Sequence, residues 1–173
     1  MLHKPGRPII VGIISNQVKI VIETERLLLR EITLDDKEAL FRLHSDPAVQ
    51  KYTGEPVVKS MEEINKAIAT RITDYKKYGF GRWATILKSG KQFVGWAGLA
   101  YLPEFDEIDL GYRFLLEYWG SGIATEASRA ILNYAFGSLK LRKIVAIAIN
   151  ENKASIRVME IVGMEFEILV TAI

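Results

Sequence analysis

The stretch of sequence best suited to bind an anion is the glycine-rich turn Trp119-Gly120-Ser121-Gly122-Ile123-Ala124. It lies between a predicted strand and a predicted helix, and the start of a helix carries unpaired N–H groups and a partial positive charge. Glycines just before the helix let the backbone approach an anion closely. The turn is therefore predicted to bind phosphate groups, although a Gly-x-Gly at such a junction is also typical of a simple tight turn.

Two well-known phosphate-binding motifs do not fit this turn. A Walker loop requires Gly-Lys followed by Ser or Thr, whereas Gly122 is followed by Ile123. A dinucleotide-binding fingerprint requires a third Gly or Ala where this chain has Thr125, and it opens a parallel βαβ unit. Here the turn comes late in the chain, after several closely spaced strands, so both motifs are excluded.

The composition is that of an ordinary globular domain and excludes several classes of site. Of the 173 residues, 49% are hydrophobic and 25% are charged, and the net charge is only +2 with both signs interleaved, so no nucleic-acid partner is expected. Without cysteine, and with only His3 and His44, no metal site is expected. No apolar run is long enough for a membrane span, and the apolar stretch near the N-terminus lacks a cleavage site, so a cytoplasmic location is expected.

The elements expected around the turn form one mixed α/β (α+β) domain over residues 23–173, preceded by an N-terminal extension over residues 1–22. The capping box Ser60-Met61-Glu62-Glu63 starts a clear amphipathic helix. Helices are expected after Thr33, after Ser60, and at residues 123–136 and 154–162. Strands are expected at residues 9–14 and 18–22 as a hairpin, and at 27–32, 83–87, 93–102, 108–115, 143–149 and 165–171.

Three segments, in order, carry a resemblance to a known family. They are Glu23–Arg30, Gly111-Tyr112 followed by Tyr118–Ala127, and Asn150–Glu160 running into Gly163-Met164. From about Thr24 to Val170 the chain resembles the GCN5-related N-acetyltransferases (GNAT), and within them the branch of the ribosomal-protein N-terminal acetyltransferases. The family signature, Gln or Arg, then two residues, Gly, one residue, and Gly or Ala, falls on Trp119 to Ala124, with Trp119 in place of the Gln or Arg.

The resemblance implies the GNAT fold and acetyl-CoA as cosubstrate. In that fold a central mixed, mostly antiparallel sheet is flanked by helices and contains a splayed pair of parallel strands, here ending near Phe114 and running over 143–149. Acetyl-CoA lies in the gap. The resemblance assigns cofactor contacts to Asn152, to the backbone of Arg113, Phe114 and Leu115, and to the turn residues Trp119, Gly120, Ser121, Gly122, Ile123 and Ala124. Asn152 is equally well placed to cap the following helix.

The implied reaction is direct transfer of acetyl from the thioester to a primary amine, either a protein N-terminus or a small amine. The attacking amine must lose a proton, and the expected general base is Asp109, which stands where the branch often has Glu. Glu107 lies on the same strand face and is the alternative candidate for the general base. Ser155 is the expected donor to the departing thiolate. For each residue a structural role is the alternative: a solvated acid for Asp109 and Glu107, a helix-surface or capping residue for Ser155.

The chain departs from the resemblance in three places. Met159 stands where many members have a tyrosine that can donate a proton. Family members continue beyond the strand at 165–171, whereas this chain stops at Ile173, and residues 9–22 add an apolar segment that the family lacks. That segment, or a strand of a second subunit in a homodimer, is expected to cover the sheet edge left open. A non-catalytic acetyl-CoA-binding module is therefore the alternative function.

Overall fold

The computed structural model describes residues 18–167 and shows a five-stranded antiparallel sheet in the order β1-β2-β3-β4-β5. The strands are β1 (Ile20–Glu23), β2 (Leu27–Arg30), β3 (Arg82–Leu87), β4 (Gln92–Leu102) and β5 (Glu107–Phe114). The helices are α1 (Lys37–Ser45), α2 (Pro47–Gln50), α3 (Met61–Tyr78), α4 (Ile123–Gly137) and α5 (Lys153–Ile161), with short 3-10 turns at Leu34–Asp36 and Leu116–Tyr118. The predicted mixed α/β fold is confirmed.

The helix boundaries follow from capping residues that the sequence already displays. Thr33 starts the first 3-10 turn with a reciprocal capping box to Asp36. The Ser60 hydroxyl accepts from the Glu63 amide at the start of α3, and Gly79 ends that helix in the left-handed region at φ +76°. Pro47 is the first residue of α2, where its missing N–H carries no penalty.

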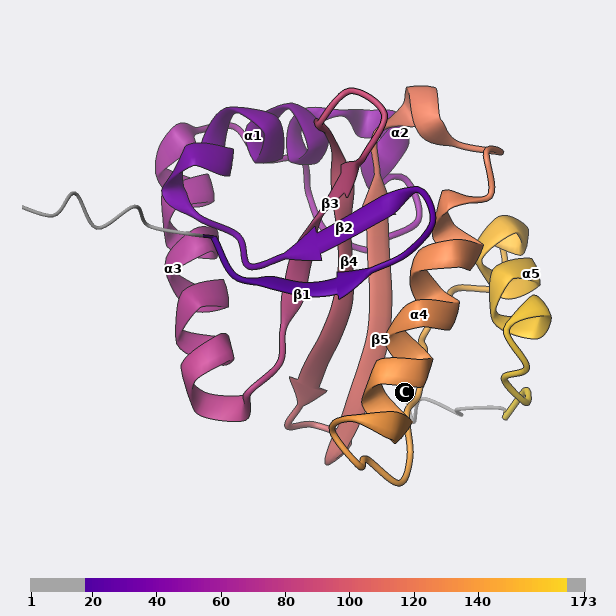
Figure 1. Cartoon of the computed structure of the whole chain (residues 1–173). Coiled ribbons are helices and arrows are strands. Elements are labelled where there is room, and N and C mark those ends of the chain that lie inside the picture. The colour runs from indigo at the N-terminus through magenta and orange to yellow at the C-terminus, as the bar shows by residue number, and fades with distance from the viewer. Residues whose placement is uncertain (1–17, 168–173) are drawn as a thin grey trace, which may run out of the picture.

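Helices cover the sheet on both faces (Figure 1). Packing against α4 buries one apolar cluster, which includes Leu110, Phe114 and Ile131. The second cluster lies against α1 and α3 and includes Leu43, Ile68 and Trp96. Because successive side chains of a strand point to opposite faces, β5 contributes to both layers, and its odd-numbered residues face the α1 and α3 side.

The strand predicted at residues 143–149 is not formed as a ladder. A single parallel bridge joins Val145 to Asp109. There the Leu110 amide donates to the Val145 carbonyl at 2.8 Å, and the Val145 amide donates to the Ile108 carbonyl at 2.9 Å. Beyond Val145 the two backbones make no further bridge among the described residues. The bridge is parallel, as expected for the splayed pair, but the second segment of that pair forms no strand.

The two ends of the chain differ from the predicted pattern. The strand expected at 165–171 is not formed in its described part, residues 165–167. Residues 168–171 lie outside the described range, as do residues 9–17 of the expected hairpin. The remaining part, β1, pairs with β2. Within residues 18–167, no helix is long and apolar enough to cross a bilayer.

Candidate active site

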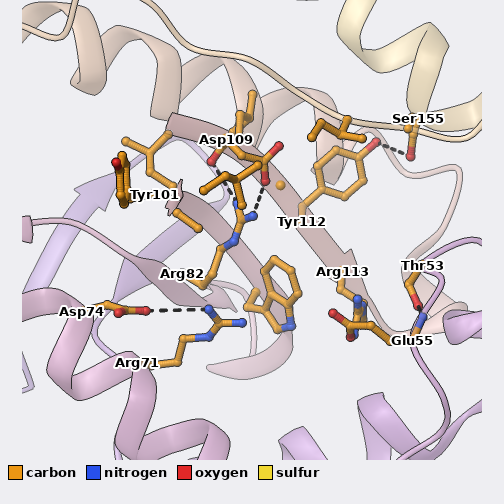
Figure 2. A pocket seen from close by; sticks show the side chains of 18 of the residues that line it. Thr53, Glu55, Arg71, Asp74, Arg82, Tyr101, Asp109, Tyr112, Arg113 and Ser155 are labelled. Atoms are coloured by element: carbon orange, nitrogen blue, oxygen red, sulfur yellow. Dashed lines mark hydrogen bonds and ion pairs between the residues drawn. The ribbon is translucent and has the colours of Figure 1, made fainter. Parts of the chain in front are cut away.

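A cleft of about 660 Å³ opens where β5 and the 143–149 segment separate (Figure 2). One wall comes from α3 and the strands β3 and β4, and the opposite wall from residues 147–149 and α5. The strand β5 forms the floor, with Asp109 through Arg113 along it. The polar side chains that line this cleft include Glu55, Arg71, Asp74, Arg82, Asp109, Tyr112, Arg113, Asn152 and Ser155.

The open edge of β5 presents backbone groups to the gap. Since Ile108 and Leu110 bond to Val145, the alternation of a strand turns the backbone groups of Tyr112 and Phe114 to the same edge. The amide of Leu115 donates to the Val94 carbonyl instead, at 2.9 Å. Three residues, Arg113, Phe114 and Leu115, were expected to pair with the pantetheine arm. Of these, only Phe114 turns its backbone groups to the gap. The second residue that does so is Tyr112.

The glycine turn begins beyond the cleft, where β5 has ended. Gly120 and Gly122 have φ of +70° and +79°, which L-residues rarely adopt. Gly122 is the N-cap of α4, and no side chain caps this helix, so its first amides stay available to an anion. The indole N–H of Trp119 donates to the Phe114 carbonyl at 2.9 Å, which ties the turn to the edge of β5.

Sequence reasoning missed a set of hydrogen bonds among Thr24, Arg26, Ser121 and Glu126 that holds the turn from the other side; we call this set the brace. The Glu126 carboxylate accepts from the Thr24 hydroxyl at 2.6 Å, from the Arg26 amide at 3.0 Å and from the Arg26 guanidinium at 2.6 Å. Arg26 also donates to the Ser121 carbonyl at 2.9 Å. Both ends of the brace lie in segments that carry the family resemblance, and this was the one signal in the sequence that pointed to them. The contact itself joins residues a hundred positions apart, so no local pattern indicates it.

Replacing Glu126 with glutamine is expected to weaken CoA binding three- to tenfold. The change removes the charge that holds Arg26 against the Ser121 carbonyl, and a partly exposed charge-assisted bond contributes on the order of 1 kcal/mol. Calorimetric titration with CoA measures the effect. Glu117→Gln is the matched control, because Glu117 pairs with Arg42 at the surface near the turn. Equal affinity of the two variants would show that the brace does not shape the anion site.

The two candidate acids have different surroundings. Asp109 lines the cleft, is 8% exposed, and forms an ion pair with Arg82 through its Oδ2 atom. Arg82 also donates to the Gly98 carbonyl at 2.6 Å and to the Asp109 carbonyl at 3.2 Å. Glu107 pairs with Lys143 and is not among the residues that line the cleft. Only Asp109 is therefore brought to the gap.

Ser155 and Asn152 lie on the opposite wall. The Asn152 side chain caps α5 by accepting from the Ser155 amide at 3.1 Å, and both residues line the cleft. The phenol of Tyr112 donates to the Ser155 hydroxyl at 3.1 Å across the gap, as Figure 2 shows. Burial raises the pKa of Tyr112, and its bond to Ser155 partly opposes that shift. Met159 lines the same wall.

A histidine that the sequence analysis considered only for metal binding lies next to the cleft. The indole N–H of Trp96 lies 3.2 Å from His44 Nε2, and Arg113 Nη1 lies 2.9 Å from His44 Nδ1. Burial and then the charge of Arg113 lower the pKa of His44 to about 4; Glu55 opposes this shift, and Arg71 adds a smaller lowering effect. The ring is therefore neutral at pH 7.

The buried neutral ring makes stability depend on pH. Because its pKa falls from the ordinary 6.5 to about 4, the unfolded chain binds more protons between these values, and stability drops as pH falls through them. Between pH 7 and 4.5, His44 is expected to contribute about 2 kcal/mol of this loss. Urea unfolding of wild type and His44→Gln at both values measures it. The loss should be smaller in the variant, and identical losses would contradict the prediction.

Comparison with known proteins agrees with this geometry. The acetyltransferase (GNAT) domain model matches residues 26–165. The uncharacterized N-acetyltransferase YoaA of Bacillus subtilis is 31% identical over 148 residues, covering 85% of this chain and 84% of that protein. A GNAT-family acetyltransferase structure from Bacillus anthracis superposes with a TM-score of 0.71 at 33% identity, covering 83% of this chain and 82% of that one.

These matches define the class first: the chain is an acetyltransferase that uses acetyl-CoA. More specifically, it belongs to the GNAT family. Spermidine N(1)-acetyltransferase of Escherichia coli strain K12 is a more distant relative, 25% identical over 143 residues, with 80% of this chain and 73% of that protein covered. Among residues 18–167, no group of acidic or histidine side chains is arranged to hold a metal ion.

Proposed function

We propose that this protein transfers acetyl from acetyl-CoA directly to a primary amine, with the reaction at the open edge of β5. The observation that carries the proposal is that Asp109 and Ser155, from distant parts of the chain, line one cleft at this edge. An acid on the floor of the cleft and a hydroxyl on its wall are the groups that a direct acyl transfer can use, one for the attacking amine and one for the departing thiolate.

The cosubstrate is proposed to lie along the edge and end on the glycine turn. The amides of Gly120 to Ala124 take the pyrophosphate, since the two left-handed glycines and the uncapped helix leave them free. The pantetheine arm bonds to the backbone of Tyr112 and Phe114 as an added strand would, and to the Asn152 amide nitrogen. This places the thioester over the cleft, close to Ser155.

In the proposed chemistry one proton leaves the amine, one reaches the thiolate, and no group other than the acetyl is transferred. As the amine nitrogen bonds to the thioester carbon, its proton passes to Asp109, directly or through water, at Oδ1, because Arg82 holds Oδ2. An amide of the open edge, from Tyr112 or Phe114, donates to the carbonyl oxygen as it gains charge. The C–S bond then breaks, and Ser155 donates its proton to the thiolate and receives one from Tyr112. Tyr112 regains a proton from water, and Asp109 releases to water the proton that it took from the amine.

Ser155→Ala is expected to lower kcat about three- to tenfold with little change in CoA affinity. The effect is modest because a thiolate leaves readily, so a donor contributes less than the base does. Steady-state rates with acetyl-CoA, together with calorimetry for CoA, separate the two quantities. Tyr112→Phe is the companion variant, because it leaves Ser155 in place and removes only the phenol behind it. If Ser155→Ala loses CoA affinity and not kcat, the serine is a cofactor contact.

Detection of free thiol during incubation of acetyl-CoA with a panel of amines tests the proposal. The panel contains small monoamines, a polyamine such as spermidine, and a peptide with a free N-terminus, because the branch resemblance and the relatives suggest both small-molecule and protein acceptors. Amine-dependent thiol release supports the enzyme. Tight CoA binding without release for any amine would favour the alternative, a non-catalytic module, which Met159 at the tyrosine position suggests.

A further inference from the structure

Three arginines surround one indole in the acceptor half of the cleft. The guanidinium carbons of Arg113, Arg82 and Arg71 lie 5.2, 5.3 and 5.7 Å from the centroid of the Trp96 ring. All four residues line the cleft. Guanidinium groups favour the face of an indole, but their positive charges repel one another and need anions nearby. How well each is paired with an anion therefore indicates what the cleft can still bind.

Only one of the three cations is fully paired. Arg82 has the buried carboxylate of Asp109 and two backbone carbonyls. Among residues 18–167, Arg71 is paired only with Asp74 at 4.0 Å, which is an ion pair without a short hydrogen bond. Burial lowers the pKa of Arg71 and, separately, that of Arg113. The Arg71 side chain is still 29% exposed, whereas that of Arg113 is 9% exposed, so water compensates the charge of Arg113 least.

Arg113 has the least complete set of partners for its burial. Its side chain is 9% exposed, yet among the described residues it bonds only through Nη1, to Glu55 at 3.0 Å and toward His44. Its Nε atom has no partner among them. A guanidinium has five N–H donors in a fork that matches a carboxylate, so most of this capacity is not used.

His44 does not supply the missing acceptor. A neutral imidazole has one acceptor nitrogen and one N–H donor. Both Trp96 and Arg113 approach it with N–H groups, so in either tautomer one of them faces another donor. In the tautomer whose Nε2 accepts from the indole, Nδ1 carries the proton, and Glu55 is then the one acceptor that Arg113 has among the described residues.

Glu55 is a counter-ion that a ligand can replace. It lies on the connection between α2 and α3, its side chain is 61% exposed, and it approaches Arg113 at the mouth of the cleft, as Figure 2 shows. Because water already reaches most of the Glu55 side chain, its carboxylate stays solvated when it leaves Arg113. A carboxylate that brings its own binding contacts can therefore take its place.

We propose that the acceptor of this enzyme carries a carboxylate as well as its primary amine, and that the carboxylate replaces Glu55 on Arg113 beside Arg71. The inference rests on the proposed amine acetylation and narrows its substrate to small amino acids in the broad sense. The same three guanidiniums disfavour a second ammonium group on the acceptor, so polyamines are expected to be poor substrates. They also disfavour the protonated form of the attacking amine, which aids its deprotonation.

Matched acceptor pairs test the inference. Amino acids with increasing spacing between amine and carboxylate, from glycine to 6-aminohexanoate, are compared with the alkylamines that lack the carboxylate. At the best spacing, kcat/KM is expected to be at least tenfold higher for the acid than for its matching amine. In Arg113→Gln this ratio should fall toward one, whereas Arg42→Gln, at an exposed pair remote from the cleft, should keep it. Glu55→Gln should raise kcat/KM for the acid, because the competing carboxylate is gone.

The outcomes separate the two proposals. Acetylation of amines with no preference for the acid, or spermidine as the best acceptor, overturns the carboxylate site and leaves the proposed function intact. If no acceptor causes release of thiol, the carboxylate site is tested by calorimetric titration of the CoA-bound protein with 6-aminohexanoate. Binding that Arg113→Gln weakens at least tenfold supports the site without catalysis, and absence of binding overturns it. Retained CoA affinity shows that the variant is folded.

Discussion

Gly122→Glu is expected to abolish CoA binding, with affinity reduced at least a hundredfold. Two effects add. Gly122 has φ +79°, where any side chain costs about 1 kcal/mol or more, and its Cβ would point toward Arg26 at the base of the turn. The new carboxylate would also lie among the helix amides that are proposed to hold the pyrophosphate, so it would repel the ligand and compete with it. Calorimetric titration with CoA provides the measurement.

Two further variants separate charge from backbone strain. Gly122→Ala introduces the strain without the charge, and its loss of affinity is expected to be much smaller. Gly163→Glu places the same residue at another left-handed glycine, φ +86°, with nothing within 4 Å of its Cβ, and away from the turn. It should bind CoA as the wild type does. A folded Gly122→Glu protein with unchanged affinity would remove the pyrophosphate from this turn.

Asp109→Asn is expected to lower kcat about a hundredfold or more while CoA affinity stays within a few-fold of wild type. The amide keeps an oxygen that can accept from Arg82 but is no longer able to take a proton from the amine. Removing one charge of a buried pair is also destabilising, by about 3–5 kcal/mol when nothing compensates. The remaining bonds of Arg82 to the Gly98 and Asp109 carbonyls should reduce this cost.

The pH profile of kcat/KM distinguishes a lost base from a distorted cleft. A variant without its base should regain rate at higher pH, where more of the free amine is already deprotonated, whereas a distorted cleft should stay slow at every pH. Glu107→Gln is the comparison, since Glu107 occupies the same strand face but pairs with Lys143 outside the lining of the cleft. If Glu107→Gln is the slow variant and Asp109→Asn is not, the base is Glu107.

Local signals in the sequence were enough to predict most elements between β2 and α5. The capping residues Thr33 and Ser60 and the glycine turn before α4 act within three or four residues of themselves, so their effect can be seen without knowledge of the fold. The segment 143–149 was mispredicted because its apolar β-branched residues suit a strand. Whether a strand forms depends on a partner, and β5 offers one for a single bridge only.

The sequence alone determined the position of the glycine turn that is proposed to bind the pyrophosphate, the family resemblance, and Asp109 and Ser155 as candidates. Their partners were decided by tertiary structure. The Arg82–Asp109 pair joins residues 27 positions apart, the Tyr112–Ser155 bond joins residues 43 apart, and the Arg26–Glu126 brace spans 100. Local sequence patterns do not predict such pairs, because the packing of the whole sheet decides which side chains lie close together. The cluster of Arg71, Arg82 and Arg113 on Trp96 has the same origin: α3, β3 and β5 each supply one cation, and only folding brings them to one indole on β4.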